Sequence, residues 1–328
     1  MQNLVNGLKT VVTTALLVGA LGATGFSIAQ SYPSKPVRVI VPYAAGGAVD
    51  AMARVFGQKY TDIWGQTVIV ENRVGAGGNI GSEVVAKAAP DGYTLLLNTS
   101  GQAVAPALYK RLSYDAVKDL APIAGTVASA LILVAPLQSS STSVKEFIAL
   151  ARAQPGKLNF GSTGIGSGPH LAQEMFKSMT GIEIVHVPYK GDAPLFPALF
   201  TNEVQLGVVP SQTALAHIKA GKLRVLAVTN SRRSAALPDV PTVGESLPGY
   251  EFGGWTALFA SGGAPRDVIR KISADTTKML AAPEVTVFYP RWGVELFNLN
   301  TEDMTARYLS DIEKFSKIIR EAKIAQVE

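Results

Sequence analysis

The fold is decided by the stretch Val39–Asp50, which reads VIVPYAAGGAVD. Its β-branched start predicts a buried strand, and the small residues that follow predict a loop with two glycines that opens a helix. Backbone N–H groups at a helix N-terminus lack partners and lie at the positive end of the helix dipole, and glycine lets a ligand approach them closely. The stretch therefore predicts a strand–loop–helix unit that suits a carboxylate or a phosphate.

A second loop of the same kind lies in the other half of the chain. Phe160–His170 reads FGSTGIGSGPH and begins at the end of a predicted strand, Leu158–Gly161. Two loops that suit an anion, far apart in the sequence, predict a clamp that closes on a small acidic molecule.

Strands and helices alternate in the first part of the chain. The apolar runs Val37–Val41, Thr67–Val70 and Thr94–Asn98 predict strands, with helical periodicity between them. A β-α-β-α-β order predicts a parallel sheet with helices on both faces, and ligands bind such sheets beyond the C-terminal ends of the strands. We expect the loops Tyr43–Gly47 and Thr99–Gln102 at such ends.

The pattern restarts further along the chain. Leu131–Val228 contains a second set of predicted strands and helices, and the C-terminal third adds a strand at Trp255–Phe259 and amphipathic helices over 266–280 and 301–322. We therefore predict an α/β protein of two lobes, each a sheet flanked by helices, with a ligand cleft between the lobes.

Two crossings between the lobes are expected, near Ala121–Ser129 and near Asn230–Pro241. Two crossings form a hinge. The predicted organisation is a signal peptide over 1–29, the first part of lobe 1 over 30–125, lobe 2 over 126–230 and a return to lobe 1 over 231–328.

The N-terminal segment predicts a secretory signal. One charge, Lys9, precedes an apolar run over 11–21, and Ser27 and Ala29 are the small residues that a signal peptidase reads. We expect cleavage after Ala29, and the alternative is an uncleaved membrane anchor. The chain has no cysteine, which excludes disulfides and thiolate metal sites. Its basic residues are scattered, so no nucleic-acid partner is expected.

Sequence motifs of catalysis and cofactor binding are absent. The three histidines, His170, His186 and His217, lack metal-ligand spacing, and neither glycine loop has the spacing of a hydrolase, dinucleotide or nucleotide motif. We therefore predict no catalytic residue, metal or cofactor. His170 either reaches a ligand or holds its own loop, His186 is structural, and Asp50 caps its helix or holds the first loop.

Several short runs recur in a known order. They are YPSKP at 32–36, PYAAGG at 42–47, ENR with GAGG at 71–78, PDGYTL at 90–95, PGKL at 155–158, HVPYKG at 186–191, IKAGKLR at 218–224 and LPDVPTV at 237–243. Together they cover nearly the whole chain after residue 29. In these runs the chain resembles the Bug (Bordetella uptake gene) family, the periplasmic substrate-binding proteins of tripartite tricarboxylate transporters.

The resemblance implies a two-lobed, type II-like periplasmic binding protein without a cofactor. It also implies a small carboxylate ligand and delivery to the membrane permease subunits of a tripartite transporter, and we expect a monomer. The family's two pincer loops correspond to Tyr43, Ala45, Gly46 and Gly47 on one side and to Ser162, Thr163, Gly164, Gly166 and Ser167 on the other. Ser100 and Gln102 on a neighbouring loop, His170 after the second loop, and Ser211 at the far end of the ligand complete the expected ligand-binding set.

The far end of the ligand is less defined. Gln212 and Trp255 are candidates there, although core packing is the better interpretation of Trp255, and Lys190 or Arg232–Arg233 could contact a second carboxylate. The sequence leaves open which carboxylate, or which neutral compound, is bound. It also leaves open a sensor that signals to a partner instead of a permease, and an enzyme with an unrecognised site.

Overall fold

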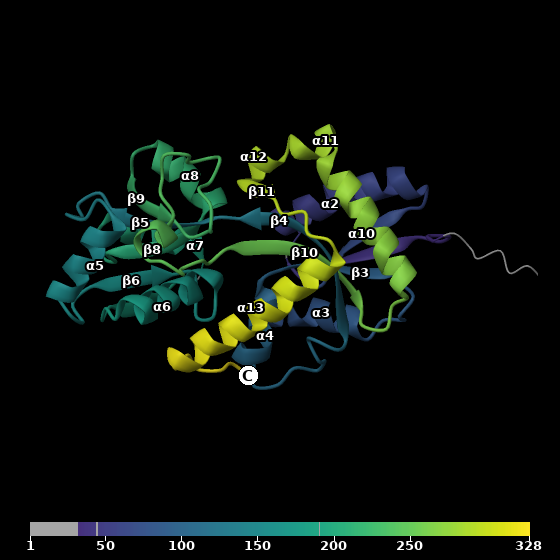
Figure 1. Cartoon of the computed structure of the whole chain (residues 1–328), viewed down its shortest axis with the longest axis horizontal. Helices are drawn as coiled ribbons and strands as arrows, with labels where there is room; N and C mark the ends of the chain where they lie inside the picture. The colour runs from purple at the N-terminus through teal and green to yellow at the C-terminus, as the bar shows by residue number, and fades with distance from the viewer. Residues whose placement is uncertain (1–31, 44, 190) are drawn as a thin grey trace, which may run out of the picture. The chain divides into compact units, whose positions relative to one another are not determined.

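The computed structural model describes residues 32–43, 45–189 and 191–328. The predicted signal peptide over 1–29, Ala44 and Lys190 lie outside the described residues. The strands of the described residues belong to the compact unit Lys35–Glu328, which contains two sheets flanked by helices, as predicted (Figure 1). Both sheets are mixed rather than purely parallel. Among the described helices, none combines the length and the apolar character that a membrane span requires.

The first sheet has six strands. β1, β2 and β3 are parallel, as the β-α-β-α-β pattern predicts, and β10 returns antiparallel between β3 and β4. In spatial order the strands are β11 (Val294–Leu296), β4 (Leu120–Ser129), β10 (Gly254–Ser261), β3 (Thr94–Thr99), β1 (Val37–Val41) and β2 (Val68–Asn72).

The second sheet has five strands and lies within the middle of the chain. β6 is parallel to both β7 and β8, whereas β5 is antiparallel to β8 and β9. In spatial order the strands are β7 (Val185–Pro188), β6 (Asn159–Ser162), β8 (Leu206–Pro210), β5 (Leu131–Pro136) and β9 (Leu223–Val228).

Helices pack on both sheets, and the C-terminal helix α13 lies alongside α4 (Figure 1). Ser143 caps α5 by accepting from Glu146 N, and Asn300 caps α13, which begins at Thr301 as predicted. The helices are α2 (Ala48–Trp64), η1 (Ala76–Gly78), α3 (Asn79–Ala86), α4 (Gly101–Leu108), α5 (Val144–Ala153), α6 (Gly168–Thr180), α7 (Asp192–Phe200), α8 (Ser211–Lys219), α9 (Val243–Ser246), α10 (Arg266–Ala281), α11 (Pro283–Thr286), α12 (Tyr289–Trp292) and α13 (Thr301–Glu321).

The segment Ala121–Ser129, near which a crossing was predicted, belongs to strand β4, and the chain passes to the second sheet directly after it. Pro122 and Gly125 weaken the strand signal in the sequence, and both lie where the pairing of β4 with β10 shifts register. The strand runs to Ser129, beyond the boundary drawn after residue 125. Only Ala130 separates β4 from β5 of the second sheet.

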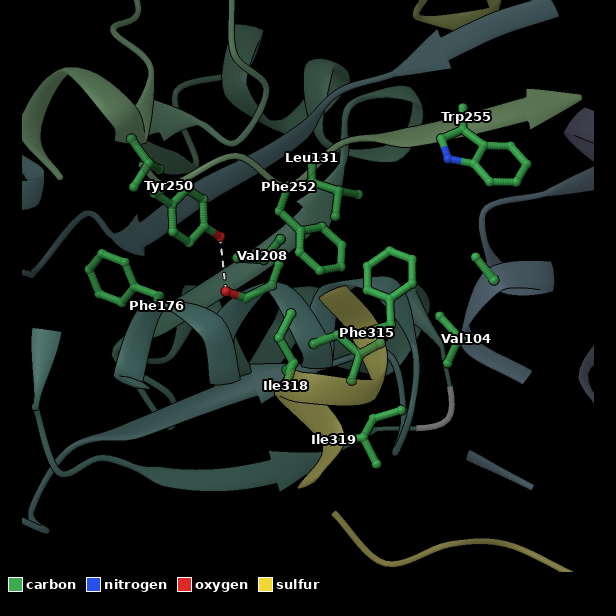
Figure 2. Close-up of a cluster of buried hydrophobic side chains, with 14 of the residues drawn as sticks. Val104, Leu131, Phe176, Val208, Tyr250, Phe252, Trp255, Phe315, Ile318 and Ile319 are labelled. Atoms are coloured by element: carbon green, nitrogen blue, oxygen red, sulfur yellow. Dashed lines mark hydrogen bonds between the residues drawn. The ribbon is translucent and has the colours of Figure 1, made fainter. Parts of the chain in front are cut away.

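The largest cluster of buried apolar side chains continues from one sheet to the other. Figure 2 draws Leu131 and Val208 of the second sheet in the same cluster as Trp255 of the first. Trp255 is 2% exposed, and its Nε1 donates to Asp311 Oδ2 at 2.7 Å. Trp255 is therefore a core residue, as the better of its two interpretations predicts.

Candidate functional site

A cavity of about 310 Å³ opens where loops of the two sheets meet. Its walls come from the end of β3 and the start of α4, from the loop Thr163–Gly168 before α6, and from Phe252 and Phe315. The C-terminal ends of β3 and β6, which belong to different sheets, therefore face one space. The volume is at the lower end of the range for small-molecule pockets.

Two helix N-termini meet at this cavity. α4 begins at Gly101 and α6 begins at Gly168, and both glycines line the wall. The positive ends of two helix dipoles therefore converge on the same space. Within the part of the chain that the structure describes, the N–H groups of Ile165 and Gly168 have no acceptor. These groups can donate to an anion.

Three hydroxyl groups on the wall add to these donors. The side chains of Ser100, Tyr109 and Thr163 line the cavity and form no hydrogen bond with another described residue. Burial raises the pKa of Tyr109, so its hydroxyl stays protonated at neutral pH. Backbone N–H groups and hydroxyls can together hold a carboxylate without an arginine.

Apolar side chains also line the cavity. They are those of Val104 and Leu108 of α4, Ile165 of the second loop, and Phe252 and Phe315. Figure 2 shows the rings of Phe252 and Phe315 side by side, with Val104 beyond them, and the two ring centroids are 5.4 Å apart. The cavity is thus lined by both polar and apolar groups.

The first glycine loop is organised by a buried carboxylate. Asp50 is 2% exposed and accepts from Gly46 N at 2.8 Å, from Arg54 Nε at 3.0 Å and from Asn72 Nδ2 at 3.0 Å. Burial acts to raise the pKa of Asp50, but the hydrogen bonds from Arg54, Gly46 and Asn72 outweigh it and hold the pKa below its usual value. Asp50 therefore holds the loop, and the Gly46 N–H is occupied.

Tyr43 joins the first loop to the cavity wall. Its hydroxyl is hydrogen-bonded to Asn98 Oδ1 at 2.9 Å and to Thr99 Oγ1 at 2.7 Å, and Thr99 lines the cavity. Residues Ala45–Gly47 are exposed and do not belong to the lining. In this arrangement the first loop borders the cavity through Tyr43 and Thr99 rather than through its glycines.

The second loop rests on two stacked imidazoles. Gly166 N donates to His170 Nδ1 at 3.0 Å, and Ser162 Oγ is hydrogen-bonded to His186 Nε2 at 2.7 Å. The two rings are 4.0 Å apart at an angle of 12°. Of the two open interpretations of His170, the structure therefore supports the one in which it holds its own loop.

Both imidazoles are neutral at ordinary pH. Burial, with the nearby His186 and Lys177 charges, lowers the pKa of His170 to about 3. Burial and Lys177 lower the pKa of His186 to about 4. An unprotonated Nδ1 is what the Gly166 N–H requires as an acceptor, so the loop geometry and the neutral state agree.

Gln102 lies beneath the cavity rather than in its wall. It is 2% exposed, and its Oε1 accepts from Ser82 Oγ at 2.6 Å and from Asn98 Nδ2 at 2.9 Å. Its Nε2 donates to Tyr114 OH at 3.0 Å. These bonds place Gln102 in a buried polar network that supports the start of α4.

Ser211 is also outside the cavity. It begins α8, is 3% exposed and donates through Oγ to Gly293 O at 2.7 Å. This bond ties a helix of the second sheet to the segment just before β11 of the first.

The structure brings part of the predicted ligand-binding set together. Ser100, Thr163, Gly164, Gly166 and Ser167 line one cavity. The apolar lining was missed, since residues 103–109 were not predicted as part of a helix. The helical spacing of its apolar residues was the signal that could have found it.

The comparisons with known proteins agree with this architecture. The family model described as the tripartite tricarboxylate transporter family receptor matches residues 52–324. Protein BugT of Bordetella pertussis is 33% identical over 320 residues, which is 96% of this chain and 98% of BugT.

Two solved structures are similar over most of the chain. R. palustris Rpa4515 with adipate has a TM-score of 0.75 and 32% identity, covering 90% of this chain and 100% of the other. MatC from Rhodopseudomonas palustris with bound malate has a TM-score of 0.71 and 28% identity, covering 88% and 100%. The family match, the relatives and the two-sheet fold lead to one conclusion: the chain belongs to the receptor family of the tripartite tricarboxylate transporters, as its sequence motifs predict.

Proposed function

We propose that this chain is a solute receptor that captures a small carboxylate in the cavity between its two sheets and delivers it to a tripartite transporter. The observation that carries the proposal is the convergence of the α4 and α6 N-termini on one cavity with unpaired donors. An anion at that place gains from both helix dipoles without a charged side chain.

The relatives support a carboxylate as the ligand. Adipate and malate are bound in two structures that share the fold over most of the chain. The family is one of receptors, and we assign the chain no catalytic step. Among the described residues, no group of histidine and acidic side chains could hold a metal ion.

The cellular setting follows from the N-terminal sequence. We propose that residues 1–29 are removed during secretion and that the protein works as a monomer in the periplasm. The partners are then the ligand and the membrane permease subunits. The two sheets would form the two lobes, with the exchange between them at Ala130 and after Val228.

The test is binding of small acids to the purified protein, measured by calorimetry and by thermal unfolding. A ligand at a hundred times its Kd should add roughly 2.7 kcal/mol of stability. The double variant Ser100→Ala/Thr163→Val removes two unpaired hydroxyls from the wall and should weaken binding at least tenfold.

Ser310→Ala is the matched control, because Ser310 is exposed on α13 away from the cavity lining. It should bind as the unchanged protein does. Binding of neutral amides in preference to every acid, or equal affinity in the double variant, would overturn the proposal.

A further inference from the structure

The short helix α4 depends on contacts from elsewhere in the chain. It contributes Val104, Ala105 and Leu108 to the cavity wall, and Tyr109, which also lines the cavity, follows directly after it. The helix has only eight residues and contains Pro106, which has no N–H for a helical hydrogen bond. A helix of this length is marginal by itself, so outside contacts should decide where its last turn lies.

Residues 326–328 supply such contacts at the end of α4. Gln326 Nε2 donates to Ala107 O at 3.0 Å, and Val327 N donates to Leu108 O at 2.9 Å. The last carbonyl groups of a helix have no partner within the helix. These two bonds therefore satisfy groups that would otherwise need water, and they attach the last turn of α4 to a segment more than 200 residues away in the sequence.

Tyr109 is held by the same segment. It forms a parallel bridge with Val327, and the N–H of the next residue, Lys110, donates to Val327 O at 3.0 Å. The hydroxyl end of the Tyr109 side chain packs closely against Gly77, where an added Cβ would overlap it. Gly77 and Tyr109 both line the cavity. Val327 thus fixes the backbone on either side of a residue whose hydroxyl lies at the cavity wall.

The segment itself is anchored in the core. Ile324 and Val327 are half-buried and pack against the main cluster of buried apolar side chains, as Tyr109 does. The helix α13, which ends shortly before them, lies alongside α4 (Figure 1). The ion pair between Lys110 and Glu328 is exposed and adds little. The backbone bonds of Val327 are therefore the contacts on which the placement of Tyr109 mainly depends.

We infer that residues 326–328 position Tyr109 for ligand binding, so that the affinity depends on a segment outside the site. None of these three residues is among the described residues that line the cavity. The inference rests on the proposed function and adds a positioning element to its site. Val327 acts through the backbone of Leu108 and Lys110 and does not touch the ligand.

The test is Val327→Pro, because proline has no N–H to donate to Leu108 O. Calorimetry with adipate, malate, hexanoate and benzoate identifies the acid that binds most tightly, and this acid is the probe. Val327→Pro should weaken its binding by about fivefold or more, as expected for the loss of one hydrogen bond.

Ile324→Ala is the matched control, because Ile324 packs against the same core cluster but forms none of the bonds to α4. It should lower the free energy of unfolding and leave the affinity within about twofold of the unchanged protein. Equal losses of affinity in Val327→Pro and Ile324→Ala would overturn the inference and leave the carboxylate receptor intact.

A double-mutant cycle with Tyr109→Phe shows whether the segment acts through the hydroxyl. In the Tyr109→Phe background, Val327→Pro should weaken binding by less than about twofold, because the group that it positions is already absent. A purely structural effect would weaken binding equally in both backgrounds, and that result would also overturn the inference.

Hydrogen exchange provides a readout that needs no ligand. The amides of residues 101–110 should exchange about tenfold faster or more in Val327→Pro than in the unchanged protein or in Ile324→Ala. Unchanged exchange in Val327→Pro would overturn the inference. If none of the four acids binds any of the proteins, the proposed function fails, and exchange still decides whether residues 326–328 hold Tyr109.

Discussion

Leu108 of α4 packs closely against Gly166 of the second loop, and both residues line the cavity. A Cβ on Gly166 would overlap the two methyl groups of Leu108, and Gly166 has a φ of +75°. Position 166 therefore requires glycine for two reasons: its backbone is left-handed, and α4 approaches it closely.

Replacing this glycine separates the two requirements. Gly166→Ala should destabilise the protein by about 2–4 kcal/mol, because an L-residue at positive φ is strained and the methyl group collides with Leu108. Ligand affinity should fall as the loop is displaced. Urea unfolding and calorimetry measure the two effects.

Gly156→Ala is the matched control, because Gly156 has a φ of +70° but nothing within 4 Å of an added Cβ. It should cost about 1 kcal/mol and leave affinity unchanged. Equal costs for the two variants would show that the Leu108 contact does not constrain the loop.

Asp50 holds the first loop in place, so replacing it should lower the free energy of unfolding. Asp50→Ala leaves the Gly46 N–H, Asn72 and Arg54 without their shared acceptor, at a cost of about 1–3 kcal/mol. Arg54→Met removes only the partner whose side chain is 54% exposed, so it should destabilise the protein less than Asp50→Ala does. The measurement is the unfolding free energy of each variant. A larger loss in Arg54→Met than in Asp50→Ala would contradict this role of Asp50.

The histidine pair predicts a loss of stability in acid. The folded-state pKa values of His170 and His186, about 3 and about 4, lie below the ordinary 6.5, so the unfolded chain takes up protons first. Stability should therefore fall as the pH drops from about 6.5 towards 4, by up to about 1.4 kcal/mol per pH unit for each ring.

His170→Asn isolates one of these rings. Asparagine can keep an acceptor near the Gly166 N–H but does not titrate, so the slope of unfolding free energy against pH should become shallower between pH 6 and pH 4. At pH 8 the histidine is unprotonated in both the folded and the unfolded chain, so stabilities measured at this pH serve as the reference. An unchanged slope would mean that His170 is not buried in its neutral form.

Two tyrosines at the site should behave differently. Tyr109→Phe removes a hydroxyl with no hydrogen bond to another described residue, so it should weaken ligand binding with little change in stability. Tyr43→Phe breaks bonds to Asn98 and Thr99 and should cost about 1 kcal/mol of stability. Melting and titration of both variants distinguish the roles, and a stability loss in Tyr109→Phe would contradict its assignment as a free donor.

The sequence predicts local structure well where one signal dominates. Runs such as Val37–Val41 are apolar throughout, and their parallel arrangement follows from the alternation with helices. β4 was missed because its signal is mixed: Pro122 and Gly125 argue against a strand, and only the pairing with β10 compensates for them.

The candidate site shows a similar division. The second loop could be found because glycines and hydroxyl residues directly before a helix predict an anion-binding loop from a short stretch of sequence alone. Of the apolar lining, only Val104 and Leu108 have a local signal, their helical spacing. Phe252 and Phe315 could not be found, since they are far apart in the sequence and meet only through tertiary packing. Gln102 and Ser211 lie near predicted loops, yet their hydrogen bonds to Asn98 and Gly293 turn them away from the cavity lining. Which residues touch the ligand stays a prediction.

The single residue Ala130 between β4 and β5 has a consequence for the energetics of capture. So short a tether keeps the ligand-binding groups of the two sheets at a high effective concentration. Little chain entropy is then lost when they close on a small molecule, and most of the contact energy is available as affinity. Lengthening this one-residue link would lower the affinity for every ligand alike, without touching a single donor in the cavity.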